Sequence, residues 1–158
     1  MNKLQQIVAY FCLNYPHKSE LSNARLTKLV YLSDWFSSLL YEYPISNIEW
    51  IFNHYGPYID DVINSVRSSY NFNIRKEKTI YGSDKYVIIF NGDEDEIELL
   101  QKEINILDAV IEKTEKLYFN EFIQYVYSTY PVVSRERYSV LNLTELAKEY
   151  NNNNQCIW

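Results

Sequence analysis

The sequence predicts a mainly α-helical (α+β) fold, a compact bundle of five or six helices with a small inserted β-hairpin or sheet around residues 48–53 and 72–90. Apolar residues recur at three- and four-residue steps along most of the chain, as on the buried face of a helix. Only the two inserted segments alternate as strands do. The length of 158 residues suits one domain, because two halves would be too small to bury good cores. We therefore expect a single domain over residues 1–150 and a polar C-terminal tail over residues 151–158.

The first two helices are predicted from their apolar positions and their boundaries. Apolar residues between positions 4 and 12 indicate an amphipathic helix that ends before Pro16, because proline disfavours a helical conformation in the residue before it. Ser22 or Asn23 can cap a second helix, which runs to about Tyr41. Apolar side chains cover nearly its whole surface, and this predicts a central helix packed on several sides.

The segment 48–53 alternates like a short strand and leads into a Gly-Pro turn. Gly56 permits a positive φ angle, and Pro57 suits the first position of a third helix, where its missing N–H would be unbonded anyway. Asp60 and Asp61 would then lie in the first helical turn. The helix dipole favours negative charge there.

Residues 72–90 have the pattern of a β-hairpin, with the turn near residues 82–84. After it, the acidic run 93–96 is predicted to open a long helix. The apolar stripe expected on this helix consists of Ile97, Leu100, Ile104, Leu107 and Ile111.

The C-terminal third has weaker patterns. A further helix is predicted from residue 119 to near Pro131, and a short one from Thr144 toward Tyr150. The asparagine run 151–154, with Gln155, is expected to be a frayed polar tail.

Charge and hydropathy restrict the partners. The formal net charge is −6 without a basic block, which argues against nucleic acid as the main partner, because phosphate binding needs clustered positive charge. A basic protein surface would be a better complement. No run of 18 apolar residues occurs, and the N-terminus lacks the continuous apolar stretch of a signal peptide. We expect a cytoplasmic protein with no membrane association, in which Cys12 and Cys156 are free thiols.

The groups that catalysis and metal binding require are scarce. The two histidines, His17 and His54, do not lie near other ligands at zinc spacing, and the three glycines form no phosphate loop. We therefore expect no enzyme, metal or cofactor. A hydrolase that pairs His54 with Asp34 is an alternative, but a histidine beside a Gly-Pro turn can equally hold that turn by bonding to the backbone.

Asp34 is a carboxylate in an otherwise apolar stretch, and such a group needs a partner. Three partners are plausible from the sequence: the end of another helix, the neighbouring cations Arg25 or Lys28, or a cation supplied by a binding partner. The first two are structural and the third is functional.

Aromatic residues are abundant, with sixteen tyrosines, and they gather around this carboxylate. Codon usage in an A/T-rich genome and enrichment at interfaces both explain such a composition. Trp50 and Phe52 are expected in the core. Tyr55 and Tyr58 flank the Gly-Pro pair, and we expect them to be half exposed, where rings beside a rigid turn commonly form binding hot spots.

Three segments resemble the Panacea domain, also called the SocA-like antitoxin domain. Residues 28–34, Lys-Leu-Val-Tyr-Leu-Ser-Asp, are similar to its first signature, a K-L-x-Y-x-x-D helix. Residues 50–58 resemble the aromatic stretch that leads into Tyr-Gly-Pro, and residues 122–131 resemble a late helix ending near proline. Together the resemblance covers about residues 20–131. The residues that carry its structural motif are Lys28, Leu29, Tyr31, Trp35, Trp50, Gly56 and Pro57.

The resemblance implies function by contact. Proteins of this family neutralise diverse cognate toxins by binding them, and one relative delivers its toxin to a cytoplasmic protease. We therefore expect an antitoxin that binds a cognate protein toxin. A prophage-associated or regulatory adaptor for another protein is the alternative, and no appended DNA-binding module is evident. The expected partner-binding residues are Asp34, Tyr55, Tyr58, Asp60 and Asp61.

Overall fold

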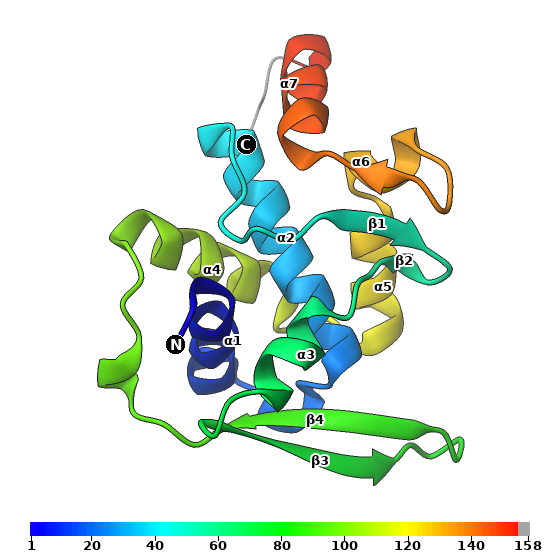
Figure 1. Ribbon diagram of the computed structural model, residues 1–158. Coiled ribbons are helices and arrows are strands. Elements are labelled where there is room, and N and C mark those ends of the chain that lie inside the picture. Colours follow the sequence, from blue (N-terminus) through cyan, green and yellow to red (C-terminus); the bar gives the residue numbers. More distant parts are fainter. Residues whose placement is uncertain (155–158) are drawn as a thin grey trace.

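The computed structural model describes residues 1–154, and it contains seven α-helices and two small antiparallel sheets within that range (Figure 1). The mainly helical α+β fold predicted from the sequence is confirmed. The helices are α1 (Lys3–Asn14), α2 (Asn23–Tyr41), α3 (Asp61–Arg67), α4 (Gln101–Thr114), α5 (Phe119–Tyr127), α6 (Tyr130–Ser134) and α7 (Leu143–Asn154). The strands are β1 (Trp50–Asn53), β2 (Gly56–Pro57), β3 (Phe72–Lys78), β4 (Asp84–Phe90) and β5 (Val140–Leu141), and short 3-10 turns cover Lys18–Glu20 and Glu94–Glu96.

Helix α2 is the centre of the fold, as its apolar surface predicted. It packs against α1, α3, α4 and α7, and its side chains are buried continuously from Arg25 to Ser38 (Figure 1). The Ser22 hydroxyl caps it by accepting a hydrogen bond from the Arg25 N–H at 3.2 Å. The helix ends at Tyr41 because Glu42 adopts a left-handed conformation, with φ of 65°.

The two sheets lie apart along the sequence and in space. Strand β1 is the middle of the order β2-β1-β5, and its third strand, Val140–Leu141, was missing from the sequence prediction. The second sheet is the predicted hairpin, in which Phe72–Lys78 pairs with Asp84–Phe90 over its full length. Its base joins the core through Phe72 and Ile88, and its far end extends past α3 (Figure 1).

Two predicted helix starts are wrong. Pro57 does not begin a helix but lies in β2, opposite Phe52, and α3 begins four residues later at Asp61. The long helix does not start at the acidic run either. Residues 94–96 form a 3-10 turn, and α4 begins after Leu100, which is 58% exposed. The buried stripe of α4 therefore consists of Glu103, Ile106, Leu107, Val110, Ile111 and Thr114.

The C-terminal helix is longer than predicted. Helix α7 runs from Leu143 to Asn154, so the asparagine run expected in a frayed tail is helical. One reason is tertiary contact, because the Asn151 side chain donates to the Leu39 carbonyl at the end of α2, at 3.1 Å. Gln155 and Cys156 lie outside the described residues, whereas Cys12 is a buried free thiol.

Candidate functional site

The predicted Gly-Pro turn is a tight hairpin between β1 and β2. Asn53 pairs with Gly56, whose φ is 95°, a conformation that side chains rarely adopt. A Cβ atom at this position would meet the Tyr127 ring at 2.5 Å. Glycine is therefore required twice, by the backbone angle and by the approach of α5. Gly56 and Pro57 are both buried, so the turn is anchored in the fold.

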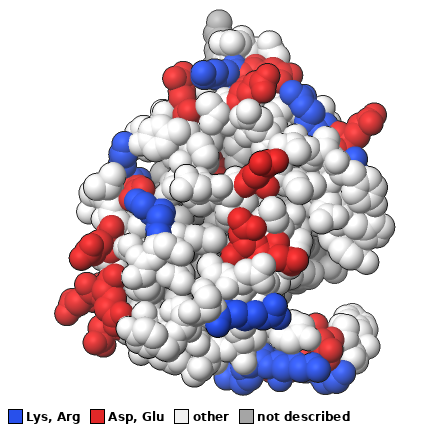
Figure 2. Space-filling model, in the orientation of Figure 1, with Lys and Arg blue, Asp and Glu red and all other residues white. Residues whose placement is uncertain are grey.

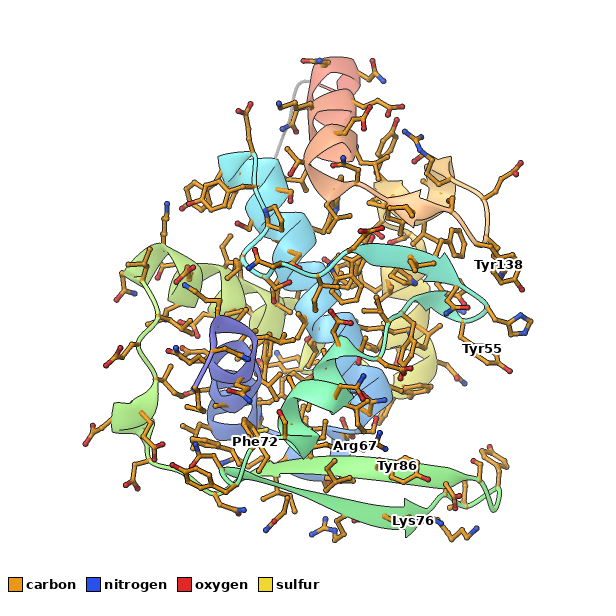
Figure 3. The ribbon with its side chains drawn as sticks, in the orientation of Figure 1. Tyr55, Arg67, Phe72, Lys76, Tyr86 and Tyr138 are labelled. Carbon is orange, nitrogen blue, oxygen red and sulfur yellow. The ribbon has the colours of Figure 1, made fainter. Side chains whose placement is uncertain are left out.

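Exposed aromatic side chains meet at the tip of this hairpin. We call His54, Tyr55, Arg137 and Tyr138 the tip cluster. Tyr55 is 74% exposed and Tyr138 is 69% exposed, and Figure 3 shows both at the outer edge of the molecule. The two come from segments far apart in the sequence, the β1–β2 turn and the loop before β5.

Hydrogen bonds and ring contacts within the tip cluster hold its backbone, and the rings of Tyr55 and Tyr138 remain exposed to solvent. The rings of His54 and Tyr55 meet edge to face at 4.5 Å, and the His54 Nδ1 lies 3.4 Å from the Tyr138 hydroxyl. The Arg137 guanidinium donates to the His54 carbonyl at 3.1 Å and lies over the Phe52 ring at 5.4 Å. The Tyr138 N–H donates to the Phe52 carbonyl at 2.5 Å. Rings positioned in this way lose little conformational entropy on binding.

Tyr58, the second ring expected at the site, is only half exposed. Its hydroxyl accepts a hydrogen bond from the Asn23 side chain at 2.8 Å and donates to Asp60 at 3.0 Å. Burial raises its pKa. Asp60 and Asp61 are exposed, so this side of the site presents two carboxylates beside the half-exposed ring of Tyr58.

Lys28 lies beneath Tyr58, with its ammonium 5.9 Å from the centre of the ring. The residue is 3% exposed, and within residues 1–154 no carboxylate lies within ion-pair distance of it. Burial lowers the pKa of this lysine to about 8. Burial of an ammonium is costly to the fold, whereas the alkyl stem of the lysine packs like an apolar side chain.

Asp34 does not face a partner, and that expectation is corrected. It is fully buried, and its carboxylate accepts hydrogen bonds from the Ser46 N–H at 2.8 Å, the Ser46 hydroxyl at 2.5 Å and the Trp50 indole at 2.9 Å. Burial raises its pKa, and the bonds from Ser46 and Trp50 oppose that rise. None of the three partners weighed from the sequence is used. Asp34 instead fastens the loop 42–49 and the start of β1 to α2.

The remaining motif residues build the core around this carboxylate. Leu29 is fully buried in α2. Tyr31 meets Trp50 edge to face at 5.5 Å, and its hydroxyl lies 2.8 Å from that of Thr129. Trp35 meets Tyr150 of α7 in the same way at 6.2 Å. These residues therefore connect α2 to β1, to the end of α5 and to α7.

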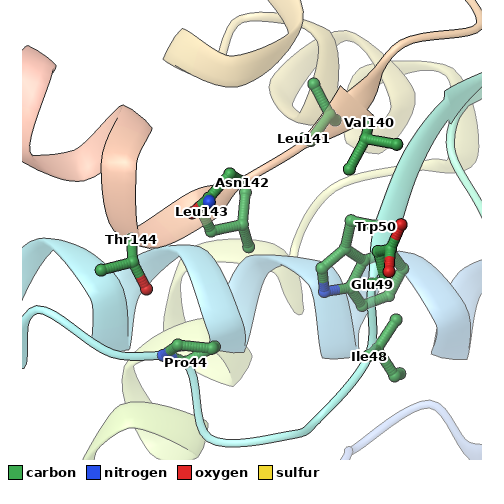
Figure 4. A pocket seen from close by; sticks show the side chains of 9 residues that line it. All are labelled: Pro44, Ile48, Glu49, Trp50, Val140, Leu141, Asn142, Leu143 and Thr144. Atoms are coloured by element: carbon green, nitrogen blue, oxygen red, sulfur yellow. The ribbon is translucent and has the colours of Figure 1, made fainter.

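A pocket of about 260 Å³ lies beside Trp50, between the loop before β1 and the start of α7 (Figure 4). Glu49 is its only titratable side chain, and the Trp50 indole is already bonded to Asp34. Within the described residues, no hydrogen bond joins the Thr144 hydroxyl to the Glu49 carboxylate, so the lining contains no nucleophile paired with a base. The lining residues are Pro44, Ile48, Glu49, Trp50, Val140, Leu141, Asn142, Leu143 and Thr144.

The hydrolase alternative finds no geometry to support it. His54 is exposed at the tip beside Tyr138, while Asp34 is buried and bonded to Ser46 and Trp50, so the two do not form an acid–base pair. Within residues 1–154 no group of three or more potential ligands could hold a metal ion. Over the same range, none of the helices is both long and apolar enough to span a membrane.

Sequence reasoning missed Arg137 and Tyr138. Their loop carries no periodic pattern, and they join the tip cluster only because β5 pairs with β1. No signal in the sequence would have identified them. Tyr138 adopts a positive φ of 71°, which is uncommon for a tyrosine, but this angle is visible only in the structure.

Comparison with known proteins identifies a family for most of this region. The family model described as "Antitoxin SocA-like, Panacea domain" matches residues 26–131, about two thirds of the chain. The match begins inside α2, includes Asp34 with its partners Ser46 and Trp50 and the β1–β2 hairpin, and ends in α6. No curated protein and no solved structure matches the chain. On the family match, the chain belongs to the SocA-like antitoxin family with the Panacea domain.

Proposed function

We propose that this protein is the antitoxin of a toxin–antitoxin pair, and that it neutralises its cognate toxin in the cytoplasm by direct, non-catalytic binding. Membership of the SocA-like antitoxin family supports this proposal. We assign the toxin-binding surface to the tip cluster, because Tyr55 and Tyr138 are largely exposed there on a backbone that internal hydrogen bonds hold.

The exposed tyrosines and the carboxylates near them indicate what kind of toxin surface would be complementary to this site. Exposed tyrosines supply apolar area and a polar tip at small entropic cost, and such residues dominate binding hot spots. Asp60 and Asp61 lie at the start of α3, beside Tyr58, and add negative charge to the same region. A toxin surface with an apolar pocket bordered by basic side chains is the complement we propose.

Co-expression tests the proposal. The product of the neighbouring reading frame should arrest growth when expressed alone, and the antitoxin should restore growth. Tyr55→Ala should weaken the rescue, whereas Tyr70→Ala, which removes a 94% exposed ring in the loop before β3, should leave it intact. If no neighbouring gene product is toxic, the antitoxin proposal fails. If Tyr55→Ala and Tyr138→Ala both rescue fully, the tip cluster is not the interface.

A further inference from the structure

The β3–β4 hairpin has one covered edge and one open edge. On the β4 side, the Ile88 N–H donates to the Leu21 carbonyl at 3.0 Å, and Val87 bridges to Ser22. On the other side, β3 pairs only with β4 within residues 1–154, so no strand of this part of the chain lies along its outer edge. An open edge of seven residues presents unpaired backbone groups to which another strand can add.

The register identifies which backbone groups face outward. Hydrogen bonds to β4 are seen at both ends of β3, between Asn91 and Asn71 at 2.7 Å and between Thr79 and Ser83 at 2.9 Å. Bonded pairs alternate along an antiparallel ladder, so the odd-numbered residues of β3 bond to β4. The backbone groups of Ile74, Lys76 and Lys78 therefore point to the open edge. The N–H of Phe72 is excluded, because it donates to the Ser69 carbonyl at 3.4 Å.

Positive charge gathers on the same hairpin. Residues 72–90 carry four basic and two acidic side chains, in a chain whose net charge is −6. Lys76 and Lys78 share the single carboxylate of Asp84, at 3.6 and 2.9 Å, and their side chains remain 61% and 69% exposed. Figure 3 places Lys76 on β3, and Figure 2 shows blue side chains gathered along this lower edge of the molecule, with red and some blue ones scattered over the body above.

The positive charge of the hairpin favours an acidic strand of another protein over a second copy of β3 at the open edge. Antiparallel pairing of two β3 edges about Arg75 would place that cation opposite its own copy, and like charges directly opposite destabilise a sheet. Pairing about Lys76 would place Lys76 opposite its own copy, although it would also place Arg75 opposite Glu77. The same side chains would attract carboxylates on an incoming strand of another protein. At the end of the edge, Ile80 and Tyr81 are 93% and 90% exposed and can cover the end of such a strand.

We propose that the open edge of β3 is a second docking surface, which accepts an extended acidic segment of a partner protein as a third strand of the hairpin. The backbone of Ile74, Lys76 and Lys78 provides the hydrogen bonds, and the side chains of Lys76 and Lys78 pair with the carboxylates, because Arg75 is already paired with Glu77 at 2.5 Å. This mode of recognition gives affinity through the main chain and specificity through alternate side chains. It goes beyond the proposed antitoxin function and does not depend on the tip cluster.

A peptide pool provides the test. Labelled eight-residue peptides carry glutamate at alternate positions and valine, isoleucine or threonine elsewhere, and a control pool has lysine in place of glutamate. Fluorescence anisotropy with the full chain should show binding of the glutamate pool, little binding of the lysine pool, and loss of affinity as salt is added.

Two variants separate the backbone contribution from the charge contribution. Lys76→Pro removes an outward N–H that β4 does not use, so the hairpin should form while the affinity falls at least tenfold. Lys76→Gln keeps that N–H and should cost only a few-fold. Circular dichroism and thermal melts verify that both variants fold.

Several results would overturn the proposal. One is no binding of the glutamate pool, and another is unchanged binding by a folded Lys76→Pro. A single-stranded oligonucleotide that binds with the same dependence on Lys76 would reassign the surface to nucleic acid. A dimer in sedimentation that Lys76→Pro abolishes would reassign it to a second copy of the chain.

Discussion

The centre of α2 and the tip of the β1–β2 hairpin use their polar and aromatic groups in opposite ways, as Asp34 and Tyr55 illustrate. Asp34 is fully buried and uses its oxygens within the fold, on Ser46 and Trp50. Tyr55 is 74% exposed, the bonds around it hold the backbone, and its ring meets the His54 ring edge to face. The bonded carboxylate of Asp34 therefore contributes to the stability of the fold and is not available to a partner. Exposed rings on a fixed backbone are the groups available for binding.

The largest expected effect lies in the core of α2. Leu29→Ala removes a fully buried side chain, and the fold should lose about 2–5 kcal/mol, the usual range for such a cavity. Urea denaturation measures this loss. A variant that unfolds at the same urea concentration as the parent would show that α2 is not the central helix.

Asp34→Ala should be nearly as costly, at about 3 kcal/mol. The substitution leaves the N–H of Ser46 and the indole N–H of Trp50 buried without an acceptor, and groups stranded in this way carry their full desolvation penalty. Glu49→Ala, an exposed carboxylate in the adjacent loop, is the control and should change stability by less than about 0.5 kcal/mol. Equal stability of the two variants would mean that Asp34 does not fasten the loop.

Lys28→Met should act in the opposite direction and stabilise the protein. Burial lowers the pKa of Lys28 to about 8. The folded state therefore disfavours its charge, by an amount on the order of 3 kcal/mol at neutral pH. Methionine keeps the apolar stem and removes the ammonium. A less stable Lys28→Met variant at pH 7 would show that the contact with the Tyr58 ring compensates the buried charge.

The pH dependence of the stability difference between the parent and Lys28→Met tests whether the charge of Lys28 destabilises the folded state. Below pH 8 Lys28 is protonated in both states and the penalty is complete. Above pH 8 the folded chain releases a proton that the unfolded chain keeps up to about pH 10, so the contribution of Lys28 to stability rises with pH. The stability of the parent relative to Lys28→Met should therefore rise by roughly 1.4 kcal/mol per pH unit above pH 8. The raised pKa of Cys12 acts in the opposite direction but is common to both proteins and cancels.

The sequence predicts those features that depend on residues close together in the chain, and it does not predict those that depend on distant residues. The Ser22 cap, the apolar surface of α2 and the 72–90 hairpin depend on residues close together in the chain, and all three were predicted. Pro57 was misplaced because its preference for a helix start was overridden by pairing with Phe52. The third strand, Val140–Leu141, was missed because two residues carry no period.

The candidate site was harder to predict than the fold, for the same reason. Tyr55 could be identified because a Gly-Pro turn is a local signal. Tyr138 reaches it across more than 80 positions of sequence, through pairing between β1 and β5. The partner of Asp34 could not be found either, since Ser46 lies in a loop without a pattern and its N–H becomes a donor only once that loop closes over α2.

The most direct test of the division between core and tip is the affinity of the purified antitoxin for its cognate toxin, measured beside thermal unfolding. The double variant Tyr55→Ala with Tyr138→Ala should melt with the parent and bind at least about thirtyfold more weakly, corresponding to roughly 2 kcal/mol for a hot spot. Tyr70→Ala, the matched exposed ring, should bind as the parent does. A double variant that melts normally and keeps full affinity would contradict the assignment of the tip cluster as the binding surface.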